Sequence, residues 1–216
     1  MNQKKNLNEF TYKYFDETSS HLWLDQQVLP IIQKLKVKRI LDVGCGNGNL
    51  AGQLVEQEFD VTGCDPEESA IEIARRLVPN GRFHVMGVYE NPFDLGQNSF
   101  DLMIATEVLE HLVLPRKLVD FARQILRHNG WLLITTPFYG GYLKNLLCSI
   151  FNKWDDQFTV LWDGGHIKFW SLRTLRQLLN EGSFELIKYK LVNRHSRWFS
   201  WIWPNNIIII ARKLDI

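Results

Sequence analysis

The stretch RILDVGCGNGNL, residues 39–50, constrains the fold of this chain more than any other stretch. Its first half reads as a short buried strand, and Gly44, Gly46 and Gly48 follow at alternate positions. Glycine loses more conformational entropy on folding than any other residue, so three glycines in one turn need a physical reason. The sequence therefore predicts a tight turn at which a ligand or another stretch of backbone comes close.

Strand and helix patterns alternate from residue 38 onward, which is typical of βαβ units. We expect seven strands, at residues 39–44, 60–65, 82–87, 100–106, 131–137, 184–191 and 206–213. Helical patterns cover residues 49–57, 66–77, 107–112 and 116–127, and a pair of helices is expected within residues 11–35. The predicted fold class is an α/β/α sandwich, in which a Rossmann-like, mostly parallel sheet of seven strands carries helices on both faces.

Two acidic residues frame the glycine turn. Asp42 precedes it, and Asp65 ends the second predicted strand, where an acid could accept both hydroxyls of a ribose. Each has a simpler interpretation: Asp42 as a turn residue, and Asp65 as the N-cap of the following helix. For Asp65 the two roles can coexist.

Four motifs in this order resemble those of the class I S-adenosylmethionine-dependent methyltransferases: LDVGCGNG, VTGCDP, FDLMIATEVLEHL and WLLITTP. The resemblance covers roughly half the chain and is closest to the branch of the ubiquinone-biosynthetic O-methyltransferases, whose E-x-x-E-H motif is matched by Glu107, Glu110 and His111. It implies S-adenosylmethionine as the cofactor. The cofactor-binding residues that it implies are Asp42, Gly44, Cys45, Gly46, Asn47, Asp65, Pro66, Val88, Thr106 and Glu107.

These residues divide the cofactor between them. By resemblance, Gly44 to Gly46 contact its amino acid part, Asp65 its ribose and Pro66 its adenine. One departure lies after the third strand, where the family often has an acid for the adenine amino group and this chain has Val88 and Tyr89. We therefore expect backbone and apolar contacts to hold the adenine.

The acceptor chemistry centres on two histidines. If residues 107–112 are helical, Glu107, Glu110 and His111 share one face. His111 is the preferred general base and His166 the second catalytic candidate. The same residues resemble the metal ligands of small-RNA 2′-O-methyltransferases, so a divalent metal remains open, and we assign no metal ligand.

We expect the whole chain, residues 1–216, to form one methyltransferase domain. Residues 1–37 supply N-terminal helices, 38–137 the cofactor-binding core, and 171–216 the last helix and closing strands. Residues 138–170 are too long for a simple connection, which predicts a lid or substrate-binding element. An apolar stripe at helical spacing within them predicts core packing: Leu143, Leu146, Leu147, Ile150 and Phe151.

Composition limits the partners. A net charge of +1 argues against a large phosphate-binding surface, so we expect no DNA partner and rank RNA below a small-molecule acceptor. No apolar run is long enough to span a bilayer, no secretory signal is readable, and three scattered cysteines form no disulfide framework, so a cytoplasmic location is expected. Six of eight tryptophans lie in the last third. The segment RHSRWFSWIWP, residues 194–204, fits a packed corner, a base-stacking platform or a peripheral membrane contact.

The predicted function is transfer of a methyl group from S-adenosylmethionine to the hydroxyl of a small phenol, catechol or diol. Two alternatives stay open: a methyltransferase acting on an RNA end or a tRNA, and a non-catalytic S-adenosylmethionine-binding regulatory protein. An NAD-dependent dehydrogenase ranks last, because Asn49 stands where its motif requires glycine. The oligomeric state is left open.

Overall fold

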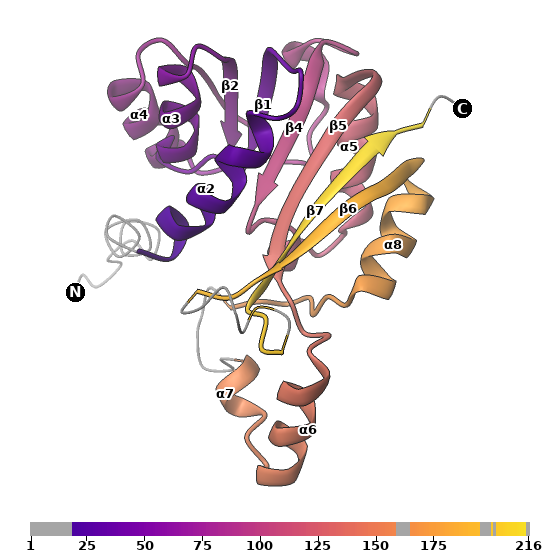
Figure 1. Cartoon of the computed structure of the whole chain (residues 1–216). Coiled ribbons are helices and arrows are strands. Elements are labelled where there is room, and N and C mark those ends of the chain that lie inside the picture. Colours follow the sequence, from indigo (N-terminus) through magenta and orange to yellow (C-terminus); the bar gives the residue numbers. More distant parts are fainter. Residues whose placement is uncertain (1–18, 159–164, 195–199, 201, 215–216) are drawn as a thin grey trace, which may run out of the picture.

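A computed structural model describes residues 19–158, 165–194, 200 and 202–214. Within them, seven strands form one sheet in the order β3-β2-β1-β4-β5-β7-β6 (Figure 1). The strands are β1 (Arg39–Val43), β2 (Asp60–Asp65), β3 (Arg82–Val85), β4 (Phe100–Thr106), β5 (Leu126–Pro137), β6 (Phe184–Val192) and β7 (Asn206–Lys213). All neighbours are parallel except β7, which runs antiparallel to both β5 and β6. The predicted fold class is confirmed.

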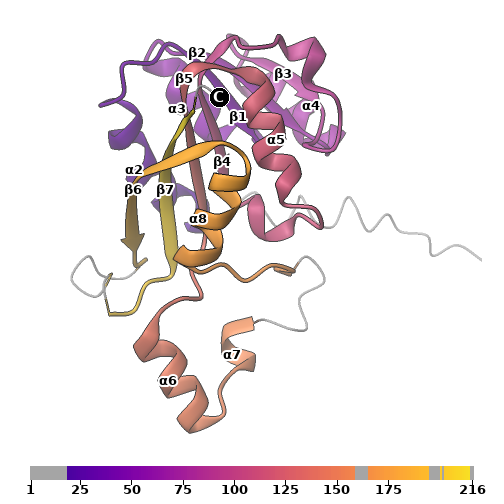
Figure 2. The same cartoon turned by 90° about the vertical axis from the view of Figure 1, so that its right-hand side faces the viewer.

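Helices cover both faces of the sheet. One core cluster joins the sheet to α2 (Ser19–Ile32), α3 (Asn49–Glu56) and α4 (Glu68–Leu77). The other joins it to α5 (Arg116–Ile125) and α8 (Leu172–Glu181), which lie on the opposite side (Figure 2). β1, β2 and β4 are buried on both faces, and the longest of them, β4, is accordingly a nearly continuous apolar run.

The strand order reverses between β1 and β4, since β2 lies on one side of β1 and β4 on the other. In open α/β sheets, ligands bind outside the carboxyl ends of the strands at such a switch point. The glycine turn leaves β1 at this point.

Several predicted boundaries are wrong. Residues 107–112 form no α-helix: they contain only a three-residue 3-10 helix, η2 (Leu109–His111). Helix α4 begins at Glu68 rather than Pro66, and β3 ends at Val85. Helix α5 stops at Ile125, and the chain passes directly into β5, so Gly130 lies inside a strand. Of the predicted N-terminal helix pair, only α2 falls within the described residues.

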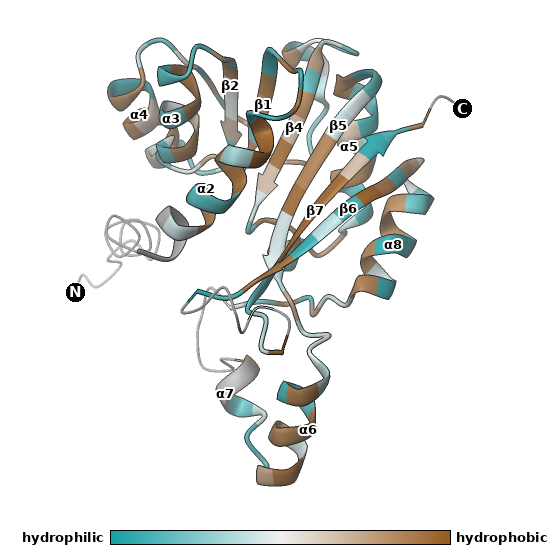
Figure 3. Ribbon diagram, in the orientation of Figure 1, coloured by the Kyte–Doolittle hydropathy of each residue, from teal (hydrophilic) through white to brown (hydrophobic). Residues whose placement is uncertain are grey.

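The segment after β5 extends away from the sheet (Figure 1). It contains α6 (Tyr142–Phe151) and α7 (Asp155–Phe158). The apolar stripe of α6 is not core, because Ile150 and Phe151 are 63% and 64% exposed and Cys148 alone in this helix is buried. In Figure 3 much of the α6 ribbon has the brown colour of hydrophobic residues. Whether this segment acts as a lid stays a prediction.

Candidate active site

The glycine turn adopts a backbone that favours glycine at three positions. The φ angles of Gly44, Gly46 and Gly48 are 70°, 52° and 80°, in the left-handed region. A Cβ atom on Gly44 would lie 2.4 Å from Cγ2 of Val108. The turn therefore packs against the segment that follows β4, which places the ends of β1 and β4 in contact.

Asp65 ties this turn to the start of α4. Its Oδ2 accepts a hydrogen bond from the backbone N–H of Gly46 at 3.1 Å, and its Oδ1 accepts one from Glu67 N–H at 2.9 Å. Burial raises the pKa of Asp65, against the opposing effect of these two hydrogen bonds. The carboxylate thus orders the turn at the place where the ribose is expected. The simpler interpretation of Asp65 as the N-cap is wrong, because the N-cap of α4 is Glu67.

Asp42 is buried beneath the turn, with 2% of its surface exposed. Its Oδ2 has no hydrogen-bond partner among the described residues. Burial, followed by the charges of Asp25 and Asp65, raises the pKa of Asp42 to about 8. An unpaired buried carboxyl is costly, so this oxygen is suited to receive a cationic or hydrogen-bond-donating group of a ligand.

The expected adenine side lies between the ends of β2 and β3. Met86 N–H donates to Asp65 O at 3.0 Å, and a Cβ on Gly87 would lie 3.6 Å from Cβ of Pro66. Val88, the next residue after Gly87, is buried. Glu90 Oε1 accepts a hydrogen bond from Gly87 N–H, so this carboxylate has a local partner. The surroundings of Pro66 and Val88 are thus mainly backbone and apolar side chains.

Thr106 and Glu107 mark the end of β4. Thr106 Oγ1 is buried without a partner among the described residues. Glu107 has a φ of 56°, a strained value for a side chain-bearing residue, and its carboxylate is fully engaged. Its Oε1 accepts from Thr135 Oγ1 and its Oε2 from Asn206 Nδ2, both at 2.8 Å. Burial nevertheless raises the pKa of Glu107 to about 7.

Glu110 is held by Thr136, the residue of β5 that follows Thr135. Its Oε2 accepts from Thr136 Oγ1 at 2.9 Å, and its side chain is completely buried. Consecutive strand residues point to opposite faces of a sheet, so Thr135 and Thr136 hold the two carboxyls on opposite sides. The prediction that Glu107, Glu110 and His111 share one helix face is therefore wrong.

Three other side chains do converge. Ligand atoms of Glu110, His111 and His166 all lie within 4.8 Å of one another. The Oε1 of Glu110 is buried and accepts no hydrogen bond from a described residue, and it lies 4.0 Å from Nε2 of His166. Tyr139 Oη is 3.0 Å from the other ring nitrogen of His166. Burial and His111 lower the pKa of His166 to about 4, so its ring is neutral at pH 7.

This trio can hold a divalent cation through one carboxylate and two imidazoles, a donor set that suits zinc and other transition metals. Burial raises the pKa of Glu110, so a cation would have to displace a proton there. Glu107, which the resemblance would include, has both oxygens occupied by Thr135 and Asn206. The residues present therefore fit a site of three ligands, Glu110, His111 and His166, rather than the set of four that would add Glu107.

Aromatic side chains pack beside the trio. The rings of Tyr139 and Phe158 stack at 5.7 Å, and Phe169 lies edge-on to both, with centroids 4.9 and 4.7 Å away. Trp154 also stacks on Phe158, with the ring centroids 5.6 Å apart. These contacts join α7 to the segment that carries His166, and they place a cluster of apolar rings beside the trio.

Sequence reasoning missed five contributors: Asp25, Thr135, Thr136, Tyr139 and Asn206. Asp25 interrupts the apolar pattern of α2, a signal that could have been used. Asn206 begins a strand that lies 99 residues from Glu107 in the chain, and no local pattern connects the two. The aromatic segment RHSRWFSWIWP lies mostly outside the described residues.

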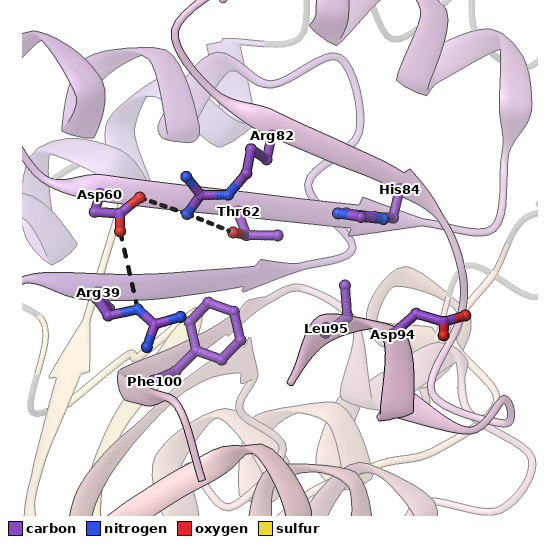
Figure 4. A pocket seen from close by; sticks show the side chains of 8 residues that line it. All are labelled: Arg39, Asp60, Thr62, Arg82, His84, Asp94, Leu95 and Phe100. Atoms are coloured by element: carbon purple, nitrogen blue, oxygen red, sulfur yellow. Dashed lines mark hydrogen bonds and ion pairs between the residues drawn. The ribbon is translucent and has the colours of Figure 1, made fainter. Parts of the chain in front are cut away.

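A hollow of about 350 Å³ lies at the opposite edge of the sheet (Figure 4). Its lining includes the first residues of β1, β2 and β3, namely Arg39, Asp60 and Arg82. Asp60 pairs with both arginines, and Arg82 also donates to Thr62. Both of its arginines are paired with Asp60, and the hollow lies away from the carboxyl ends of the strands, so we do not assign the active site to it.

Comparison with known proteins agrees with this geometry. A family model described as a methyltransferase domain matches residues 19–189. A ubiquinone biosynthesis O-methyltransferase from Hydrogenovibrio crunogenus is 26% identical over 68% of this chain and 64% of its own length. One from Photobacterium profundum is 26% identical over 63% of this chain and 66% of its own length. The chain thus spans slightly less than two thirds of these curated relatives.

The fold is also similar to that of solved methyltransferase structures. The crystal structure of a SAM-dependent methyltransferase from Archaeoglobus fulgidus superimposes with a TM-score of 0.69 at 16% identity, covering 96% of this chain and all of the other. The chain belongs to the methyltransferase domain family, and within it to the class I S-adenosylmethionine-dependent methyltransferases. The cofactor of this class is S-adenosylmethionine. No helix in the described part of the chain has the length and apolarity needed to cross a membrane.

Proposed function

We propose that this protein transfers the methyl group of S-adenosylmethionine to the oxygen of a small-molecule hydroxyl. The observation that carries the proposal is the convergence of Glu110, His111 and His166 next to the glycine turn, to which Val108 connects them by its contact with Gly44. Methyl transfer to a hydroxyl requires removal of its proton, and this cluster offers groups for that step. The relatives named as O-methyltransferases support oxygen as the acceptor.

In this proposal the cofactor lies across the carboxyl ends of β1, β2 and β4. Asp42 Oδ2 receives the methionyl ammonium, and Asp65 receives the ribose while it orders the turn. Pro66 and Val88 enclose the adenine. The backbone of Thr106 borders the sulfonium, and Glu107 lies beside the methionyl group. Gly44, Cys45, Gly46 and Asn47 of the glycine turn complete the predicted set.

His111 is the proposed general base, because it is the exposed member of the trio and an acceptor can reach it. His166 is neutral and fixed by Tyr139, so it orients the acceptor hydroxyl by a hydrogen bond. The aromatic rings of Phe158 and Phe169 exclude water from the acceptor. A divalent cation held by Glu110, His111 and His166 would lower the pKa of a bound hydroxyl.

The test measures S-adenosylhomocysteine formed with catechol, phenol, an aliphatic diol and an aromatic amine as acceptors. We expect turnover with a hydroxyl acceptor and a loss of about 100-fold or more in His111→Gln. His128→Gln, a change in an exposed histidine on the far part of β5, is the matched control and should retain activity.

Methylation of the amine alone, or no product with any acceptor despite cofactor binding, would contradict the proposal. The second result would favour a non-catalytic cofactor-binding protein. Repeating the active reaction with EDTA decides the role of the trio: lost activity that zinc or manganese restores assigns it to a cation, and retained activity assigns it to His111 as base.

A further inference from the structure

Asp25 belongs to α2, and its side chain contacts α3, the helix that follows the glycine turn. Only 3% of it is exposed. Its Oδ2 accepts hydrogen bonds from Asn49 Nδ2 and Gln53 Nε2, each at 3.0 Å. Asn49 is the first residue of α3 and directly follows Gly48. These bonds hold a carboxyl group of α2 beside the turn. None of the motifs quoted in the sequence analysis includes Asp25.

The charges around this turn are unbalanced. Asp25, Asp42 and Asp65 act on it together, and none of them forms an ion pair with a lysine or arginine in the described ranges 19–158, 165–194 and 202–214. Asp42 contributes a buried oxygen without a partner, which independently indicates a missing ligand group. Carboxylates removed from water are stabilised by a cation, so the turn favours a positively charged ligand.

The two forms of the cofactor differ in this property. S-adenosylmethionine has an ammonium, a carboxylate and a sulfonium, and is therefore a net cation. S-adenosylhomocysteine has lost the sulfonium charge with the methyl group and is net neutral. A carboxylate near the turn attracts the first more than the second, because Coulombic attraction acts over several ångströms in a poorly hydrated site.

We propose that Asp25 is a specificity-determining residue, whose carboxylate makes the site prefer the sulfonium cofactor over its neutral thioether product. This inference depends on S-adenosylmethionine as the cofactor and not on the identity of the acceptor. Its consequence is relief of product inhibition, since the spent cofactor leaves a site that no longer attracts it.

The geometry allows the charge of Asp25 to be removed alone. Both donors meet the same oxygen, so the amide oxygen of an Asp25→Asn variant can accept both hydrogen bonds. Asp65 offers no such variant, because its two oxygens accept from two different backbone N–H groups. Glu56→Gln is the matched control: it removes an exposed carboxylate from the last residue of α3.

The experiment measures dissociation constants by calorimetry at pH 8, above the pKa of about 6 that burial gives Asp25. The ligands are S-adenosylmethionine, S-adenosylhomocysteine and sinefungin, which has an amino group in place of the sulfonium. In Asp25→Asn we expect weaker binding of both cationic ligands and an unchanged neutral one, so the preference falls by about three- to tenfold. In Glu56→Gln the preference should be that of the wild type.

Two results would overturn the inference while leaving the cofactor site intact. Equal weakening of all three ligands in Asp25→Asn would show that Asp25 only holds α2 against α3. Wild-type affinities for all three ligands would show that its charge has no effect on the site. Absence of S-adenosylmethionine binding by the wild-type protein would overturn this inference together with the proposed function.

Discussion

Residues with positive φ lie both in the glycine turn and at the end of β4, the two segments that meet at the candidate site. Gly44 needs its conformation because Val108 occupies the space of a side chain. Glu107 adopts a similar φ of 56° although it carries a side chain. Such strain costs of order 1–3 kcal/mol and persists only when surrounding contacts impose it, as the hydrogen bonds from Thr135 and Asn206 do here.

Replacing Gly44 by alanine should damage both folding and cofactor binding. The new Cβ would meet Cγ2 of Val108 at 2.4 Å in an unfavourable backbone region. We expect a loss of about 1–3 kcal/mol in the free energy of unfolding, measured by urea denaturation, with weakened S-adenosylmethionine binding. Gly96→Ala is the control, since Gly96 also has positive φ, at 89°, but lies in a different loop. Equal cofactor affinity in both variants would contradict the expectation.

Asp42→Asn should stabilise the unliganded protein and weaken cofactor binding. The folded-state pKa of Asp42 is raised from 3.8 to about 8, so the folded protein binds this proton more tightly than the unfolded chain. The stability that this proton contributes is fully present below pH 3.8 and is lost as the pH rises through the folded-state pKa of about 8. The free energy of unfolding of the variant should therefore exceed that of the wild type increasingly from about pH 5 to pH 8. A constant difference across this range would argue against the buried, unpaired carboxyl.

Among the elements, the end of β5 organises the acidic residues of the site. Thr135 and Thr136 follow one another on this strand and each donates to a different glutamate. The residue that each glutamate meets is thus set by strand alternation rather than by helix periodicity. The closing strand β7 adds Asn206, so the antiparallel end of the sheet also takes part in the site.

Thr136→Val should destabilise the fold through Glu110. Valine has nearly the same shape as threonine but cannot donate a hydrogen bond, so the buried Glu110 carboxyl would lose its side-chain donor. We expect a loss of about 1–3 kcal/mol in the free energy of unfolding. Thr136→Ser retains the hydroxyl and should recover most of this loss. Similar stabilities of the Val variant and the wild type would show that the bond adds nothing.

The apolar face of α6 should tolerate charge. Since Ile150 is 63% exposed, Ile150→Lys should change the free energy of unfolding by less than about 0.5 kcal/mol. Leu54→Ala in α3, at a fully buried position, should cost about 2–5 kcal/mol in the same thermal and urea measurements. A large loss of unfolding free energy in Ile150→Lys would instead show that the apolar stripe of α6 packs as core, as its periodicity predicted.

The whole molecule should respond to its cofactor. Elements from the N-terminal helix to β4 meet at the glycine turn, so a bound cofactor would stabilise the folded state relative to the unfolded chain. At 100 times its dissociation constant, S-adenosylmethionine should add about 2.7 kcal/mol, or roughly 5–10 °C in the melting temperature. NAD at the same concentration should leave the melting temperature unchanged, and an equal shift with both would contradict the cofactor assignment.

Much of the fold follows from local patterns. The strand cores, the mostly parallel sheet and the glycine turn could be predicted because strand burial, turn glycines and helix signals act over a few residues. The boundaries that failed lie where long-range contacts override local preference. The segment from Glu107 to Leu112 looks helical, yet the hydrogen bond from Asn206 and the packing of Val108 on Gly44 hold it in a strained turn.

The sequence by itself determined the class of fold, the place of the glycine turn and the identity of Asp42 and Asp65 as the acidic residues beside it, because these depend on neighbours along the chain. Only the tertiary structure decided which acids face one another: Glu110 joins His111 and His166, Glu107 joins Asn206, and Asp25 joins the turn. Those partners come from separate elements, and their meeting depends on the sheet order and on which face of each strand or helix a side chain occupies. A one-dimensional pattern does not carry that information.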